Sequence, residues 1–130
     1  MDQPNQSYSR GSQDKALLAM TIGQAFDRTV AQHPDGEALV VRHQQQRYTW
    51  RQLAETVELH ARAFIALGMQ TGDRLGIWAP NCAEWLICQV ASAKLGVILV
   101  NINPAYRSSE LDYVLKQSGC QWLVCAGSFK

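Results

Sequence analysis

The sequence lacks most of the features that would indicate a function directly. Its 130 residues carry a formal net charge of +1 and only 18% of them are charged, so we expect no electrostatic footprint for nucleic acid or an anionic membrane. No apolar run reaches the roughly eighteen residues that a membrane-spanning helix needs. The first ten residues, MDQPNQSYSR, have no apolar core of a signal peptide. The sequence therefore predicts a cytoplasmic protein without a membrane span.

Signals for metal or phosphate binding are also sparse. The four cysteines, Cys82, Cys88, Cys120 and Cys125, show no C-x-x-C spacing, which argues against a metal site and predicts reduced thiols, with Cys88 and Cys125 buried. Residues 71–73 (TGD) precede an apolar strand rather than a helix, so they do not match a phosphate-binding loop. No G-x-G-x-x-G dinucleotide fingerprint follows a strand. We therefore predict no catalytic, cofactor-binding or metal-binding residue in this chain.

The strongest structural signal is the segment 73–104. A short apolar run at 75–79 (LGIWA) is followed by an almost wholly apolar stretch at 82–95, and then by a second short run at 97–100 (VILV). Strand, helix and strand within about thirty residues predict a βαβ unit with a right-handed crossover.

The helix of this unit is apolar on most sides, which predicts burial. We expect Trp85, Leu86 and Val90 to be largely buried. Asn81 and Glu84 have the spacing of a cap and its reciprocal partner, so we expect Asn81 to begin the helix.

The flanking segments complete an α/β fold class, a partial parallel sheet (βαβαβ) flanked by helices, with an N-terminal helix and a hairpin. Residues 1–20 are polar and predict a disordered or loosely ordered tail. The remaining predicted elements are a helix at 21–33, a hairpin at 37–49, a helix at 50–67, a helix capped by Ser108 or Ser109, and a strand at 121–126.

Several polar and aromatic residues lie in or beside the predicted strands and helices. Open parallel sheets bind ligands at the carboxyl ends of their strands, so Trp78, Asn101 and Asn103 could lie near a pocket. His33 follows the first helix and His60 lies beside an apolar stripe, positions that favour structural roles over catalysis or ligand binding.

Four segments together resemble the N-terminal region of the adenylate-forming enzymes, the superfamily of acyl-CoA synthetases, luciferases and adenylation domains. The resemblance spans roughly residues 21–130. Residues 101–106 (NINPAY) and 110–115 (ELDYVL) are most similar to the medium- and long-chain fatty acyl-CoA synthetases. The four segments are 48–53 (YTWRQL), 72–77 (GDRLGI), 80–85 (PNCAEW) and 93–96 (AKLG).

The resemblance implies a two-step ligase. Such enzymes join a carboxylate to ATP with release of pyrophosphate and then transfer the acyl group to the thiol of CoA. The full-length parent would thus use a fatty acid, ATP, Mg²⁺ and CoA, none of which we expect bound to this chain. The family's phosphate loop with its lysine, its AMP-contacting residues and its C-terminal lysine are absent from the 130 residues. The resemblance therefore implies that residues 21–130 are the N-terminal part of a large domain, inactive alone and prone to self-association through unpaired sheet edges.

Two alternatives stay open at this point. The chain could come from the adenylation domain of a peptide synthetase, which activates an amino acid and passes it to a carrier protein. It could also be a non-catalytic interaction domain in which helix 82–95 meets a partner.

Overall fold

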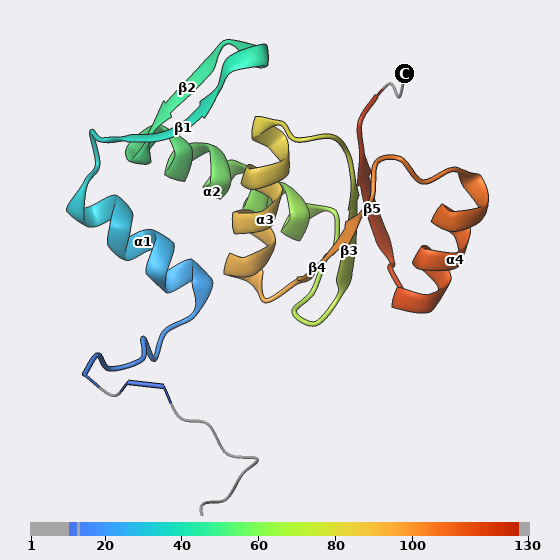
Figure 1. The fold of residues 1–130 in the computed structure, drawn as a ribbon, viewed down its shortest axis with the longest axis horizontal. Helices are drawn as coiled ribbons and strands as arrows, with labels where there is room; N and C mark the ends of the chain where they lie inside the picture. The colour runs from blue at the N-terminus through green and yellow to red at the C-terminus, as the bar shows by residue number, and fades with distance from the viewer. Residues whose placement is uncertain (1–10, 13, 128–130) are drawn as a thin grey trace, which may run out of the picture.

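A parallel sheet of three short strands separates two groups of helices (Figure 1). The computed structural model describes residues 11–12 and 14–127. The sheet has the order β4-β3-β5, with β3 (Arg74–Trp78) between β4 (Ile98–Ile102) and β5 (Trp122–Cys125). Strand and helix alternate from β3 to β5, so the predicted βαβαβ arrangement and the α/β fold class are confirmed.

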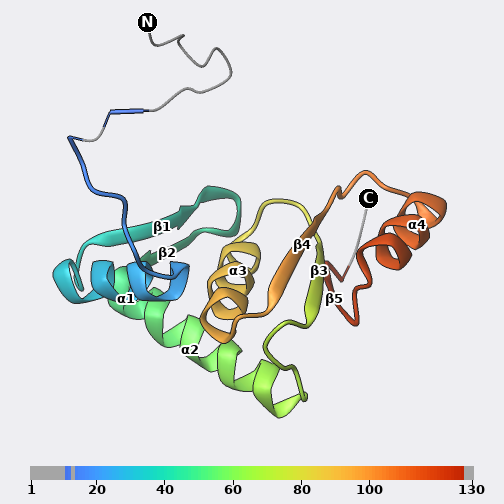
Figure 2. The same ribbon diagram turned by 90° about the horizontal axis from the view of Figure 1, so that it is seen from below.

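Three of the four helices lie on one side of the sheet, and α4 lies on the other (Figures 1 and 2). This arrangement follows from strand order, because a crossover from β3 to β4 and a return to the far edge at β5 place successive helices on opposite faces when both are right-handed. The helices are α1 (Ile22–Gln32), α2 (Trp50–Ala66), α3 (Ala83–Leu95) and α4 (Ser108–Ser118).

The predicted hairpin is also confirmed. Strands β1 (Glu37–Val41) and β2 (Gln46–Thr49) pair antiparallel. The polar turn between them contains a short 3₁₀ helix, η1 (Arg42–Gln44), followed by Gln45 in the left-handed region at φ 54°.

Capping boxes begin two of the helices, α1 and α2. The Thr21 and Thr49 hydroxyls accept bonds of 3.2 Å from the backbone amides of Gln24 and Gln52. In return, each glutamine side-chain oxygen accepts a 2.9 Å bond from its threonine amide. Both helices thus begin at positions that three-residue spacing identifies.

The predicted starts of α3 and α4 are wrong by one residue. Cys82 rather than Asn81 precedes α3, and its side chain makes no capping bond. The first amide of α3 is satisfied instead from the hairpin, as described below, so α3 does not depend on a cap from its own flank. Arg107, not Ser108 or Ser109, precedes α4, and its backbone amide donates to Glu110 at 2.8 Å.

The core lies between α2, α3 and the face of the sheet toward them. Its most buried side chains include Leu53, Val57, Leu75, Ile77 and Ile87, each at most 2% exposed.

Burial of α3 differs from the prediction in detail. Val90 is buried as expected, whereas Trp85 and Leu86 are only half-buried. Cys88 is buried, but Cys125 is exposed, so the prediction for Cys125 is wrong. Strand residues alternate between faces, and Cys125 falls on the face that α4 only partly covers.

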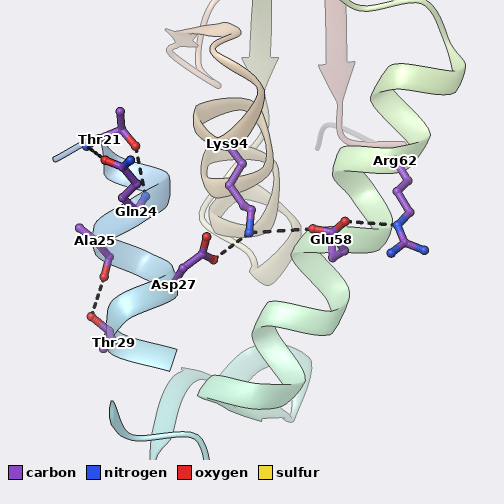
Figure 3. Close-up of polar contacts among 8 residues, drawn as sticks. All are labelled: Thr21, Gln24, Ala25, Asp27, Thr29, Glu58, Arg62 and Lys94. Atoms are coloured by element: carbon purple, nitrogen blue, oxygen red, sulfur yellow. Dashed lines mark hydrogen bonds and ion pairs between the residues drawn. The ribbon is translucent and has the colours of Figure 1, made fainter. Parts of the chain in front are cut away.

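One lysine links the helices on the core side (Figure 3). The Nζ atom of Lys94, from α3, lies 2.7 Å from an Asp27 oxygen of α1 and 3.9 Å from a Glu58 oxygen of α2. The backbone of Gly23 packs against the Lys94 stem, where an added Cβ would lie 3.1 Å from Cγ. Glycine at this position therefore lets α1 approach α3 closely.

The N-terminal tail is described only in part. Residues 14–20 form no helix or strand, and Leu17 and Leu18 are exposed. Residues 1–10 and 13 lie outside the described residues, so the predicted tail and the domain boundary at residue 20 stay predictions. Among the helices that the described residues form, none has the length and apolar character to cross a membrane.

Candidate functional site

A pocket of about 580 Å³ opens at the carboxyl ends of β3 and β5. This volume lies within the range of roughly 300–1,000 Å³ that is typical of small-molecule sites. Its walls come from the hairpin turn, α2, the start of α3, and the residues that follow β3 and β5. The apolar lining residues are Phe64, Ile77, Ala79, Pro80, Trp85, Val124 and Ala126.

A second hollow, of about 420 Å³, lies along the outer surface of α4. Its lining comes from one helix and the loop before it, and includes Tyr106 and Tyr113. Because several separate elements converge on the first pocket, that pocket is the better candidate site.

The polar groups at the first pocket gather around Gln44. Its Oε1 accepts a 2.8 Å bond from the amide of Ala83, and its Nε2 donates a 2.8 Å bond to a Glu84 carboxylate oxygen. The bond from Gln44 is the main reason why the pKa of Glu84 lies below its usual value. Glu84 is therefore ionised near neutral pH.

His60 joins the same polar group from α2. Its Nδ1 lies 2.8 Å from the carbonyl oxygen of Thr56, and since a carbonyl only accepts, Nδ1 must carry the proton. His60 is half-buried, and its structural role stays a prediction.

Three cysteines, Cys82, Cys88 and Cys125, are among the residues that line the pocket. Burial raises the pKa of Cys88 to about 11 and also raises the pKa of Cys82. Because the thiolate is the reactive form, these two thiols are poor nucleophiles near neutral pH. No group of three or more His, Cys, Asp or Glu side chains in the described part of the chain could hold a metal ion. The pocket can bind an apolar group but has no evident catalytic chemistry.

The residues that sequence reasoning placed near a pocket, Trp78, Asn101 and Asn103, lie at the same edge of the sheet but do not line the pocket. Trp78 Nε1 donates to the Asn103 carbonyl oxygen at 3.1 Å, and the Asn103 side chain accepts from the amide of Ala105 at 2.9 Å. Asn101 is exposed. Alternation along β3 turns Ile77 toward the pocket and Trp78 away from it. Trp78 and Asn103 thus stabilise the loop after β4.

No pattern in the sequence indicates a role for Gln44. The polar run at 43–46 (HQQQ) predicts a solvated turn. The Gln44 side chain instead accepts a hydrogen bond from Ala83, which begins a helix 39 residues later. No spacing rule connects such distant positions, so only the fold identifies this contact.

Comparison with known proteins places these observations in a family context. A family model described as "AMP-binding enzyme" matches residues 26–129. The chain is 44% identical over 124 residues to medium-chain acyl-CoA ligase ACSF2, mitochondrial, of Mus musculus, a match that covers 95% of this chain and 20% of that protein. The chain thus spans about a fifth of the length of the curated relatives it matches.

Solved structures share the fold. The N-terminal domain of FACL13 from Mycobacterium tuberculosis superposes with a TM-score of 0.80 at 27% identity, over 82% of this chain and 27% of that one. An artificially fused adenylation–PCP di-domain of a peptide synthetase, NpsA-ThdA from Klebsiella oxytoca, gives a TM-score of 0.77 at 26% identity, over 81% of this chain and 20% of that one.

Proposed function

The chain belongs to the AMP-binding enzyme family, and from this membership we propose that it forms part of an ATP-dependent fatty acid:CoA ligase. The observation that carries the proposal is the 44% identity to a medium-chain acyl-CoA ligase along 95% of the chain. The chain's curated relatives include acyl-CoA ligases of this family, which use ATP and CoA. A medium- or long-chain fatty acid is the proposed substrate.

The proposed reaction has two steps. A carboxylate oxygen of the fatty acid attacks the α-phosphorus of ATP, held with Mg²⁺, and pyrophosphate leaves. The CoA thiol, after losing its proton, then attacks the acyl carbonyl, and AMP leaves with the former carboxylate oxygen. Activation thus replaces a poor leaving oxygen by AMP.

The proposed role of this chain is to supply scaffold for catalytic groups elsewhere in a longer parent. The first pocket supports this assignment. Its described lining residues include the anionic Glu84 and no lysine or arginine to bind phosphates. We expect the 130-residue chain alone to bind neither ATP-Mg nor CoA usefully. Titration calorimetry should show no saturable heat, and a micromolar signal for ATP would contradict this role.

Carboxylate-dependent exchange of labelled pyrophosphate into ATP tests the function of the full-length parent, because the exchange reports the first step without CoA. We expect exchange with medium- or long-chain fatty acids, followed by thioester formation when CoA is added. Amino acids are tested in the same exchange assay, because a peptide-synthetase adenylation domain would activate one of them instead. No exchange with any carboxylate, from a folded parent, would overturn the proposal.

Peptide-synthetase adenylation is the second candidate, supported by the shared fold with NpsA-ThdA. Exchange with an amino acid and none with fatty acids would favour it. The interaction-domain alternative is disfavoured by the burial of α3, since its residues Ile87, Cys88 and Ala91 contribute to the chain's own core.

Location and assembly complete the proposal. We propose a cytoplasmic protein, although the relative ACSF2 is named as mitochondrial; fractionation of cells that express the tagged parent would decide between the compartments. We also propose that the isolated chain self-associates through its open sheet.

A further inference from the structure

The carboxamide of Gln44 joins the hairpin turn to the start of α3. Four backbone amides at a helix N-terminus have no partner within the helix. Cys82, the residue before α3, gives no side-chain cap. Gln44 supplies the missing acceptor, at 2.8 Å from the Ala83 amide, and it bonds Glu84 at the same distance through its other end.

These two bonds act where packing is weak. The hairpin strands pack on the core through Val41, Leu39 and Tyr48, whereas the turn residues His43 and Gln45 are exposed. In the described residues, the side-chain hydrogen bonds between η1 and α3 are those of Gln44. The contact between the hairpin turn and α3 therefore depends on one half-buried side chain.

The same two segments form facing walls of the pocket. His43 and Gln44 line one wall, and Cys82, Glu84 and Cys88 line the wall that α3 provides. Cys88 is 4% exposed, so reagents reach it only when the structure opens locally.

We propose that Gln44 is a latch: its two hydrogen bonds hold the hairpin turn against the start of α3, and their release opens the pocket and exposes Cys88. The open state keeps the core, because none of residues 42–47 belongs to the core cluster that contains Leu53, Val57 and Ile77. The latch controls access to the pocket whatever the parent enzyme acts on, so its test does not depend on the proposed function.

The cysteines provide the measurement. The chain is treated with iodoacetamide at about pH 8, where alkylation through a small thiolate fraction is slow enough to follow. The alkylation rate of each cysteine is measured by mass spectrometry. Comparing each thiol with itself between variants removes differences in intrinsic reactivity. Removing a helix N-cap weakens a local structure by about fivefold to tenfold in its equilibrium constant. We expect Cys88 to react about fivefold to tenfold faster in Gln44→Ala.

Three comparisons make the result specific. Gln44→Met keeps the length of the side chain without its hydrogen bonds and should accelerate Cys88 as Gln44→Ala does. Gln32→Ala, on the exposed surface of α1, should leave all rates unchanged. Cys120, which lies between α4 and β5 and does not line the pocket, should keep its rate in every variant.

Two results would overturn the latch. In the first, the Cys88 rate stays unchanged in both Gln44 variants. In the second, all four cysteines react faster together, which would report global destabilisation. Hydrogen exchange adds an independent check, since the Ala83 amide should lose protection in both Gln44 variants, and retained protection would also overturn the proposal.

Discussion

The indole Nε1 of Trp122 donates a hydrogen bond to Asp73 Oδ2 at 3.1 Å. Asp73 precedes β3 and Trp122 begins β5, so the carboxylate joins the starts of two neighbouring strands. The same oxygen accepts a 3.0 Å bond from the amide of Gln70. The sequence context of residues 71–73 argues against a phosphate loop. Their role is structural, because Asp73 connects the turn to the starts of β3 and β5.

The first prediction concerns the two hydrogen bonds that Asp73 accepts. Asp73→Ala removes the acceptor of two donors, one of them on the half-buried Trp122, and should lower the free energy of unfolding by about 1–3 kcal/mol. Asp73→Asn keeps one side-chain oxygen and should cost less. Urea unfolding followed by circular dichroism gives both values. An Asp73→Ala variant as stable as the unaltered chain would contradict the role assigned to the carboxylate.

Local patterns account for most of the fold that could be predicted. The capping boxes at Thr21 and Thr49 depend on residues three positions apart, and the apolar runs of β3 and α3 are continuous in sequence, so both are visible without a structure. The family motifs are likewise short segments. These features identified every helix and strand, with errors of about one or two residues at the ends.

The candidate site could not be predicted in the same way, because it depends on contacts between distant segments. Gln44 reaches Ala83 across the fold, and periodicity carries no information about that meeting. Burial on α3 was also ambiguous, since a helix that is apolar all round has no preferred face. The exposure of Cys125 depends on how far α4 extends over β5, which only the assembled layers show.

The second prediction uses this revised pattern of burial. Ile87 is 2% exposed, so Ile87→Ala should lower the free energy of unfolding by about 2–5 kcal/mol. Leu86→Ala, at a half-buried position, should cost less. Ile65→Ala is a matched control on α2, since Ile65 is 57% exposed. If all three variants lost the same stability in urea, α3 would not pack against the sheet as described.

The third prediction concerns alkaline pH. Burial raises the pKa of Cys88 from 9.0 to about 11 in the folded chain. Between these values the unfolded chain has lost the thiol proton that the folded chain still holds, so stability falls as pH rises. The contribution of Cys88 is therefore fully present below about pH 9 and is lost toward pH 11.

Denaturant unfolding of Cys88→Ala tests the sign of this effect. The substitution should change stability at pH 7 through packing, but its stability should decline less steeply than that of the unaltered chain from pH 9 to 11. Cys125→Ala is the control, because Cys125 is exposed. Parallel pH profiles for the unaltered chain and Cys88→Ala would show that the thiol is not desolvated.

The last prediction concerns the face of the sheet that α4 leaves open. Ile98 is 48% exposed and Leu123 is 40% exposed, and the strand register places both on the same face as Gly76. On this side α4 contributes no fully buried residue. In the described residues β4 and β5 also have no partner on their outer edges. An apolar face beside unpaired edges favours pairing with another copy.

We therefore expect the isolated chain to form a dimer or larger species in light scattering across a dilution series. Leu123→Lys should shift the equilibrium toward monomer, because burying the added charge against a second copy is unfavourable. Val40→Lys is a matched control, since Val40 is 37% exposed but lies on the hairpin, away from this face. A chain that stays monomeric at high concentration would show that α4 covers the sheet sufficiently. Equal effects of the two lysines would place the contact elsewhere.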